Sequence, residues 1–276
     1  MTPAAILHHS TAHVMAAAVR RLFGDVQLDI GKDTEDGAFF YYDFDLPHRL
    51  TPGDFPRIEA EMTRLAEAGL PFERLEVPRE EARRLLAGQR YKLERLADIP
   101  EGETVSLYRC GEFLDLCRGP HLATTGDLGA FKLVSVAGSY YRGDEKNPML
   151  QRVYGMAAAT PAELDAALAR LEEARRRDHR LLGRELDLFS ISDEVGPGLA
   201  HWHPRGARVR VAIEDFWRRE HYRAGYEMVF TPHLGRAGLW ETSGHLGFYR
   251  ESMYPLMTVA EEDRHAITDI MGQTPE

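Results

Sequence analysis

The chain has 276 residues, of which 43% are hydrophobic and 28% are charged, so it is too long for a disulfide mini-protein and too apolar for a disordered chain. Lysine and arginine total 34 against 44 aspartates and glutamates, which gives a formal net charge of −10 at pH 7. This balance argues against a protein that coats DNA, because Lys and Arg make the phosphate contacts of non-specific nucleic-acid binding.

The sequence also bears on where the protein works. No stretch approaches the roughly 18 consecutive apolar residues of a transmembrane helix, and residues 1–10 lack the basic and apolar regions of a signal peptide. The two cysteines, Cys110 and Cys117, are too few for a disulfide framework. We therefore expect a cytoplasmic protein that does not contact a membrane.

The first 70 residues predict two helices that flank a β-hairpin. An Ala-rich run over 7–23 lacks Gly and Pro and is expected to be helical. Residues 26–46 alternate in character around an Asp-Gly turn signal at 36–37, which predicts two hairpin strands. A second helix is expected over 52–68, with a proline in its first turn.

Shorter elements are predicted as far as residue 136. A helix is expected over 80–87. Strands are expected at four places: 72–77, 104–107, 113–116 and 131–136. Helices and strands follow one another without the regular βαβ repeat of a doubly wound sheet, so the sequence predicts the α+β fold class.

Residues 160–182 predict one long helix, which opens with a Thr-Pro N-cap and an acidic first turn. Its C-terminal half is rich in arginine: Arg175, Arg176, Arg177, Arg180 and Arg184. Two interpretations are open. Arginines near a helix C-terminus are favoured by the helix dipole in a solvated connecting helix. Alternatively, Arg175, Arg176 and Arg180 contact an RNA backbone.

The C-terminal third begins with a Gly-Pro-Gly break at 196–198. A second long amphipathic helix is predicted over 205–224, followed by a strand over 227–231. Residues 235–257 are expected to be rich in loops, and 258–276 carry no strong structural signal.

The candidate chemistry lies in two pairs of side chains. His9 and His13 are four residues apart on a predicted helix and therefore share one face. Cys117 and His121 are also four apart, around a Gly-Pro turn that would fold the imidazole back toward the thiol. Such a set suits a zinc site or an acid–base cluster, and spacing alone does not decide. In a strand, Asp115 would share a face with Cys117 and orient an imidazole or a water.

These residues belong to a series of motifs that resembles the bacterial threonyl-tRNA synthetases, a class II family. The matching segments occur in the family's order: 9–13, 37–44, 91–92, 115–121, 137–144, 150–155, 177–180, 186–189 and 202–206. Residues 213–232 resemble motif 1, a helix and strand that build the class II dimer interface. The resemblance implies an editing domain over 1–160, shared in fold with alanyl-tRNA editing proteins, and a linker helix over 161–183. A truncated catalytic domain, an antiparallel sheet with helices, would occupy 184–276.

The resemblance implies hydrolysis of the ester that joins serine to the 3′ end of tRNA-Thr. Serine lacks only one methyl group of threonine, and a binding pocket distinguishes such a group by about 1–3 kcal/mol, so a second site must remove the error. By the family's pattern, six residues line that site: His9, His13, Lys92, Asp115, Cys117 and His121. Gly31 and Tyr42 would help to hold the terminal adenosine and the seryl group.

The resemblance also implies roles for these side chains. His9 or His13 would activate or position water, and Lys92 would stabilise the oxyanion or the ribose oxygen. Asp115 would hold the seryl ammonium or orient the cluster. No cofactor is required in this interpretation. The alternative is zinc, which the alanine-editing relatives hold with a His, His, Cys, His set that maps here to His9, His13, Cys117 and His121.

Threonine ligation is expected to be absent from this chain. The family's catalytic domain carries motifs 2 and 3 and a zinc held by one Cys and two His, and this sequence has no cysteine after Cys117. The expected partner is the acceptor end of seryl-tRNA-Thr, with no DNA. A homodimer, or pairing with a full-length synthetase through the motif 1 region, is also expected. The competing hypothesis is a non-catalytic dimerisation or regulatory partner, or a decayed fragment. The six site residues favour the hydrolase.

Overall fold

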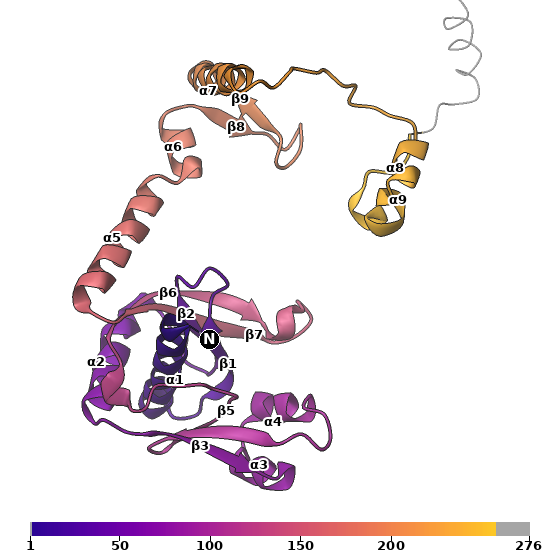
Figure 1. Ribbon diagram of the computed structural model, residues 1–276. Coiled ribbons are helices and arrows are strands. Elements are labelled where there is room, and N and C mark those ends of the chain that lie inside the picture. Colours follow the sequence, from indigo (N-terminus) through magenta and orange to yellow (C-terminus); the bar gives the residue numbers. More distant parts are fainter. Residues whose placement is uncertain (1, 258–276) are drawn as a thin grey trace, which may run out of the picture. The chain divides into compact units, whose positions relative to one another are not determined.

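A computed structural model describes residues 2–257, and the contacts between elements divide them into two units, 2–186 and 187–257. The first unit combines helices with two antiparallel sheets, which confirms the α+β class (Figure 1). The described helices include none with the length and apolar character needed to cross a membrane. The division into 1–160, 161–183 and 184–276 stays a prediction.

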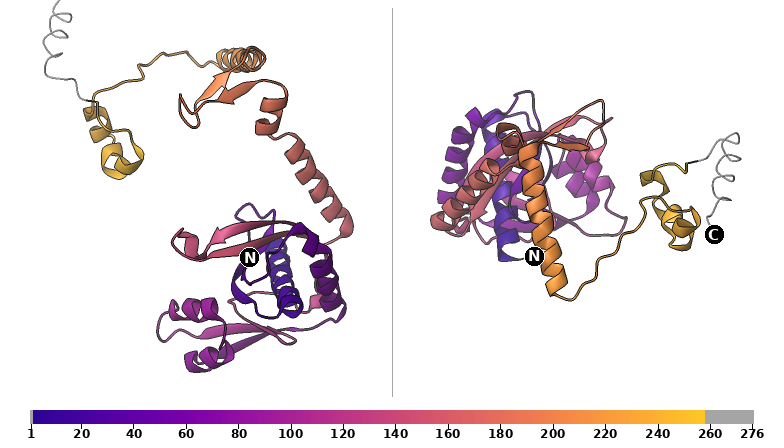
Figure 2. Two further views of the ribbon diagram at one scale, coloured as in Figure 1. Left: turned by 180° about the vertical axis from the view of Figure 1, so that it is seen from behind. Right: turned by 90° about the horizontal axis from the view of Figure 1, so that it is seen from above.

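The larger sheet has the strand order β1-β2-β7-β6. Its strands are β1 (Gln27–Asp33), β2 (Phe40–Asp45), β6 (Ala130–Tyr140) and β7 (Met149–Ala158). Two helices that contact each other pack against this sheet, α1 (Pro3–Phe23) and α2 (Phe55–Glu67) (Figure 2). Buried apolar side chains such as Val14, Met15 and Phe44 fill the space between these layers. This packing buries the middle of α1, where His9 and His13 lie.

The smaller sheet has the order β3-β4-β5. Its strands are β3 (Phe72–Val77), β4 (Val105–Cys110) and β5 (Phe113–Leu116). Two short helices accompany it, α3 (Arg79–Leu85) and α4 (Arg90–Ala97), around a small core that includes Ala82, Leu96 and Leu107. Helix α4 accompanies the smaller sheet and also contacts β1 of the larger sheet. The helix that carries Lys92 therefore lies between the two sheets.

Most predicted elements of the first unit are present. The helices predicted over 7–23, 52–68 and 80–87 correspond to α1, the turn and helix at 52–67, and α3. β6 is longer than the predicted 131–136, and neither β7 nor α4 was predicted. β7 carries Gly155, because a Cβ there would lie 2.2 Å from the Phe40 ring of the paired strand. A glycine inside a strand weakens the sequence pattern that predicts a strand, although close packing requires the glycine here.

The single helix predicted over 160–182 is wrong. The structure has two helices, α5 (Pro161–Arg176) and α6 (His179–Glu185). The predicted N-cap is confirmed, since the Thr160 side chain accepts a hydrogen bond from the Glu163 amide. The helix ends because the Asp178 carboxylate accepts from the Arg180 amide and caps the start of α6.

The second unit begins with a hairpin that was not predicted, β8 (Phe189–Ile191) and β9 (Ala200–Trp202). The helix predicted over 205–224 is confirmed as α7 (Pro204–Arg223). The strand predicted over 227–231 is wrong, because no segment within residues 2–257 pairs with it and an isolated strand leaves its backbone hydrogen bonds unmade. Three short turns of helix follow: Gly238–Thr242 (α8), His245–Phe248 (α9) and Arg250–Ser252. The predicted tail over 258–276 lies outside the described residues.

Candidate functional site

The six residues predicted for the site lie together in the first unit, although they come from distant parts of the chain. α1 supplies His9 and His13, α4 supplies Lys92, β5 supplies Asp115, and the following segment supplies Cys117 and His121. All of them except His121 line one pocket of about 350 Å³, and His121 Nε2 lies 3.3 Å from the Sγ of Cys117. The i, i+4 spacing of each pair therefore serves a common site.

Cys117 contacts two of the three imidazoles in the cluster. Its Sγ lies 3.2 Å from His9 Nε2 and 3.3 Å from His121 Nε2. The His13 ring is 5.0 Å from the His9 ring and 4.3 Å from the His121 ring, centroid to centroid. The predicted folding of His121 back toward the thiol is what the structure shows.

The proton of His9 is assigned by its neighbours. His9 Nδ1 lies 3.3 Å from the Pro120 carbonyl oxygen, which only accepts, so Nδ1 carries the hydrogen and Nε2 presents a lone pair. Burial lowers the pKa of His9, opposed by this carbonyl. Burial also raises the pKa of the Cys117 thiol to about 12. At neutral pH the site therefore holds a neutral imidazole beside a protonated thiol.

A buried ion pair lies next to these rings. Lys92 Nζ is 2.5 Å from Asp115 Oδ1, and the two side chains are only 4% and 2% exposed. The other carboxylate oxygen accepts a hydrogen bond of 2.6 Å from the Tyr42 hydroxyl. Burial, followed by the charge of Asp115, raises the pKa of Tyr42 well above its usual value. His13 Nε2 lies 3.6 Å from Asp115, and burial together with His9 and Lys92 lowers the pKa of His13 well below its usual value.

Gly31 is part of the pocket wall, whereas Tyr42 supports Asp115 from behind that wall. The two residues are paired between β1 and β2, and a Cβ on Gly31 would lie 2.3 Å from Tyr42 Cδ2. The glycine therefore allows the Tyr42 ring to cross the strand and reach Asp115.

We expect Gly31→Ala to lower the free energy of unfolding by about 1–3 kcal/mol, as overpacking does, and to displace the Tyr42 hydroxyl. Urea unfolding measures the first effect. The matched control is Gly53→Ala, because a Cβ there meets only Thr51 Oγ1 at 3.4 Å. Equal stability of the two variants would contradict the packing argument.

The structure adds residues that the sequence did not indicate. Asp29 and Arg95 line the pocket and form a two-bond ion pair with distances of 2.8 and 3.0 Å. Arg118 lines it too, with no hydrogen bond or ion pair to any residue among 2–257. Phe72 stacks on the His121 ring at 5.0 Å. Only Arg118 carried a signal, since it lies inside the 115–121 motif.

The four residues His9, His13, Cys117 and His121 could hold a metal ion. One ligand atom from each lies within 4.8 Å of all the others. Tetrahedral zinc with bonds of about 2.3 Å to sulfur and about 2.0–2.1 Å to nitrogen would separate the sulfur from each nitrogen by about 3.6 Å. The observed sulfur–nitrogen distances of 3.2 and 3.3 Å come close to this value, so the donor set fits zinc.

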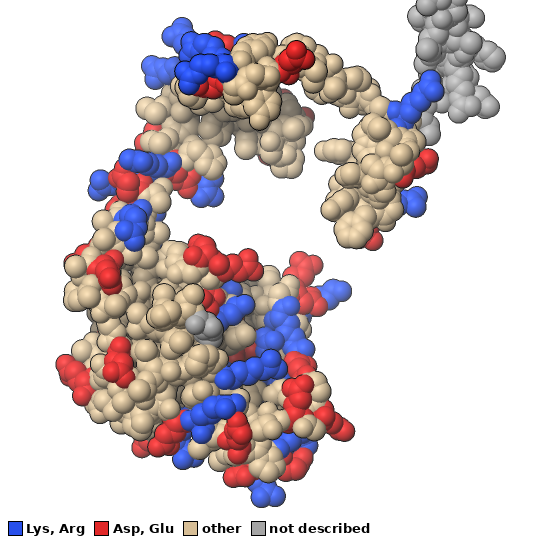
Figure 3. Space-filling model, viewed as in Figure 1, with Lys and Arg blue, Asp and Glu red and all other residues tan. Residues whose placement is uncertain are grey.

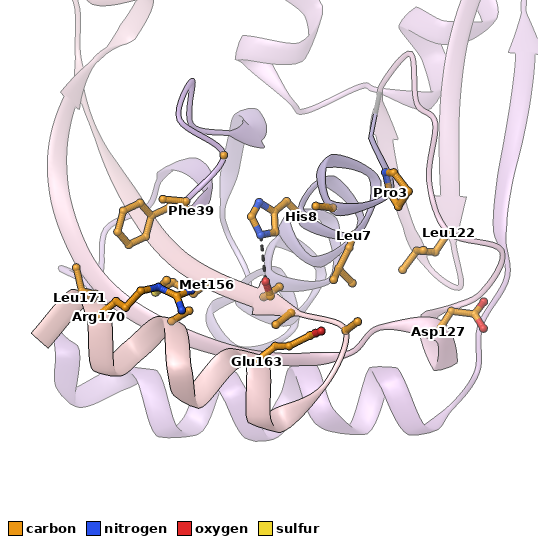
Figure 4. A pocket seen from close by; sticks show the side chains of 17 residues that line it. Pro3, Leu7, His8, Phe39, Leu122, Asp127, Met156, Glu163, Arg170 and Leu171 are labelled. Carbon is orange, nitrogen blue, oxygen red and sulfur yellow. Dashed lines mark hydrogen bonds between the residues drawn. The ribbon is translucent and has the colours of Figure 1, made fainter.

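A second and larger cavity of about 770 Å³ lies on another side of α1 (Figure 4). His8 belongs to this cavity, and its Nε2 donates a hydrogen bond of 3.1 Å to the Ala157 carbonyl. Its lining is mainly apolar, with Phe39 and Met156 in view, and it contains none of the six candidate residues. Adjacent histidines on one helix thus face different environments.

The arginines proposed for RNA contact are exposed on α5 and α6. Arg176 pairs with Glu172 at 3.7 Å, and Arg180 pairs with Asp178 at 2.6 Å. Arg175 lies in the last turn of α5. Figure 3 shows both acidic and basic side chains over the face in view. None of the three arginines lines the pocket.

Comparison with known proteins agrees with the motifs. Residues 105–154 match the family described as the threonyl and alanyl tRNA synthetase second additional domain. Threonine–tRNA ligase of Dehalococcoides mccartyi is 55% identical over 258 residues, which cover 94% of this chain and 44% of that protein. The threonine–tRNA ligase of a Sulfurihydrogenibium species is 51% identical over 93% of this chain and 41% of that protein. The chain therefore spans less than half the length of these relatives, and the resemblance to threonyl-tRNA synthetases is confirmed.

Proposed function

We propose that this relative of the threonine–tRNA ligases is an editing hydrolase, which cleaves the ester between serine and the 3′ end of tRNA-Thr. One observation carries the proposal. A single pocket places a neutral imidazole with a free lone pair beside a buried ammonium–carboxylate pair, His9 next to Lys92 and Asp115. A base and a fixed positive charge are the two groups that ester hydrolysis needs.

The residues support the following course. His9 Nε2 accepts a proton from water as the water oxygen attacks the seryl carbonyl carbon. The Lys92 ammonium stabilises the negative charge that develops on the carbonyl oxygen. The carbon–oxygen bond to the ribose then breaks, and the proton passes from His9 to the leaving ribose oxygen. The products are serine and tRNA-Thr, and no net proton is consumed at the imidazole.

Asp115 and Cys117 have supporting roles in this scheme. Asp115 holds Lys92 in place and offers negative charge to the seryl ammonium. Because burial raises the pKa of Cys117 to about 12, the thiol is protonated at neutral pH and does not serve as the nucleophile. Gly31 lines the part of the site that would hold the terminal adenosine and the seryl group, and Tyr42 acts there through its hydrogen bond to Asp115.

The direct test is incubation of the chain with Ser-tRNA-Thr and with Thr-tRNA-Thr. We expect the seryl ester to be hydrolysed faster than the threonyl ester and faster than in buffer alone. A seryl rate equal to the spontaneous rate would overturn the proposal.

We further propose that these 276 residues alone do not activate threonine. An ATP–pyrophosphate exchange signal above background would refute this second proposal.

We propose that hydrolysis requires no bound metal, because Lys92 already supplies positive charge at the site. We expect chelator treatment to leave the deacylation rate within about twofold of its original value. If zinc were bound, the four-residue set would hold it and the ion would supply a Lewis acid. Elemental analysis that shows one zinc per chain, lost in a Cys117→Ser variant together with activity, would reverse this proposal.

We propose that Arg175, Arg176 and Arg180 contact phosphates of the acceptor arm. Each such contact adds about 0.7–0.9 to the slope of log affinity against log salt concentration. Replacing all three by alanine is therefore expected to flatten the salt dependence by up to about two to three in slope. An unchanged slope would leave α5 and α6 as a solvated connection stabilised by the ion pairs to Glu172 and Asp178.

A second candidate function is a non-catalytic dimerisation or regulatory partner. The observation that favours it is the exposure of apolar side chains on α7, with Ile213 at 62%, Phe216 at 58% and Trp217 at 52%. Sedimentation of the chain alone, and with a full-length synthetase, distinguishes a homodimer from a mixed complex.

We expect the protein to act in the cytoplasm, where its proposed substrate is made, without binding DNA.

A further inference from the structure

Ser10 lies between the two site histidines on α1 and is completely buried. We propose that Ser10 is a positioning residue that keeps the proton of His121 on Nδ1, so that His121 Nε2 is able to accept the thiol proton of Cys117 and leave His9 Nε2 free. The consequence for catalysis rests on the proposed editing function. The position of the His121 proton does not, and a separate experiment tests it.

Three groups surround the Ser10 hydroxyl. Its Oγ lies 2.8 Å from the Ile6 carbonyl oxygen, 2.9 Å from the Leu122 amide nitrogen and 3.2 Å from His121 Nδ1. A serine hydroxyl has one hydrogen and two lone pairs. The Ile6 carbonyl can only accept, and 2.8 Å is an ordinary distance for a hydrogen bond between two oxygens. The hydroxyl hydrogen therefore goes to Ile6, and the Leu122 amide donates to one lone pair of Oγ.

One lone pair of Ser10 Oγ is left for His121. It can be used only if Nδ1 carries a hydrogen and donates it, and 3.2 Å lies at the long end of the ordinary range for a nitrogen donor and an oxygen acceptor. Nε2 of the same ring then has no hydrogen. With Nδ1 protonated, the hydroxyl, the amide and the imidazole nitrogen all have partners.

The His121 ring is held in place by its neighbours. Phe72 stacks on it with an interplanar angle of 9°, and the Tyr108 ring lies 4.5 Å away at a steep angle. The two rings thus confine the imidazole on two sides. Its proton could still lie on either Nδ1 or Nε2. Ser10 fixes the proton on Nδ1 through one hydrogen bond.

This assignment decides whether His121 is able to accept the thiol proton of Cys117. Both His9 Nε2 and His121 Nε2 face Sγ with lone pairs, and one S–H can be donated to only one of them. Donation to His121 leaves His9 Nε2 available for water. If the His121 proton moved to Nε2, that N–H would donate to Sγ and the S–H would turn to His9, which blocks the proposed base.

The first test is a long-range nitrogen–proton correlation spectrum of the full chain with ¹⁵N-labelled histidine. A His121→Gln spectrum identifies the signals of this ring. We expect Nδ1 of His121 to be the protonated nitrogen and Nε2 the unprotonated one. The reverse assignment in the wild-type protein overturns the proposal.

The second test compares Ser10→Ala with Thr11→Val. Thr11 is the matched control, because it is equally buried and its hydroxyl also bonds the carbonyl four residues earlier, at 2.7 Å, without contacting the cluster. We expect Ser10→Ala to lower kcat for Ser-tRNA-Thr by about 10- to 100-fold, the usual range for lost orienting partners, with KM within about twofold. The His121 signals should show both proton positions. Thr11→Val should change neither.

The outcomes separate the two proposals. If the wild-type protein does not hydrolyse Ser-tRNA-Thr but shows the expected His121 proton position, the editing function fails and the role of Ser10 in fixing the proton stands. If Ser10→Ala keeps both the wild-type proton position and the wild-type kcat, Ser10 has no positioning role.

Discussion

A variant with both His9→Ala and His13→Ala is expected to hydrolyse Ser-tRNA-Thr about 10²- to 10⁴-fold more slowly than the wild-type chain, the range lost with a general base. The reason is that His9 Nε2 carries the free lone pair of the pocket, and His13 is the neighbouring imidazole on the same helix face. Single-turnover deacylation with excess protein measures the chemical step directly.

The chain offers a close control for this variant. His8 precedes His9 on the same helix, but its Nε2 donates to Ala157 in the other cavity. His8→Gln keeps a hydrogen-bond donor near that carbonyl and should deacylate at the wild-type rate. If the His9 and His13 double variant is as fast as His8→Gln, the imidazoles are not the base and the proposed mechanism is wrong.

The largest expected effect on stability comes from Asp115→Asn. This change leaves the Lys92 ammonium unpaired in a site where its side chain is only 4% exposed. Removing one partner of a buried ion pair typically costs about 3–5 kcal/mol. We expect a loss of that size in the free energy of unfolding, measured by urea titration, together with loss of deacylation.

Two comparisons isolate the buried charge as the cause. Glu80→Gln breaks an exposed pair with Arg83, whose side chains are 72% and 54% exposed, and should cost under about 1 kcal/mol. Adding Lys92→Met to Asp115→Asn removes the unpaired ammonium and should recover most of the stability without the activity. A double variant as unstable as Asp115→Asn would show that the lost stability has another origin.

Much of the fold was predictable because its signals are local. Apolar spacing, prolines in first turns and the Thr160 cap indicate helices from neighbouring residues alone, and those helices are present. The wrong predictions of a strand and of a single long helix have causes that the local pattern does not show. The strand predicted over 227–231 finds no partner within the described residues. The helix predicted through Asp178 is interrupted because this side chain caps a new one.

The candidate site divides in the same way. The sequence by itself determined which chemical groups are present and that His9 and His13 share one helix face, because the α-helix repeats every 3.6 residues or so. The motif resemblance predicted that six residues share one site, but only the tertiary structure decided the contacts within it: Cys117 with His9 across 108 residues, buried Asp115 with Lys92, and Ser10 with His121. Those contacts depend on how α1, α4 and β5 pack together, and the spacing of residues along the chain carries no information about that packing.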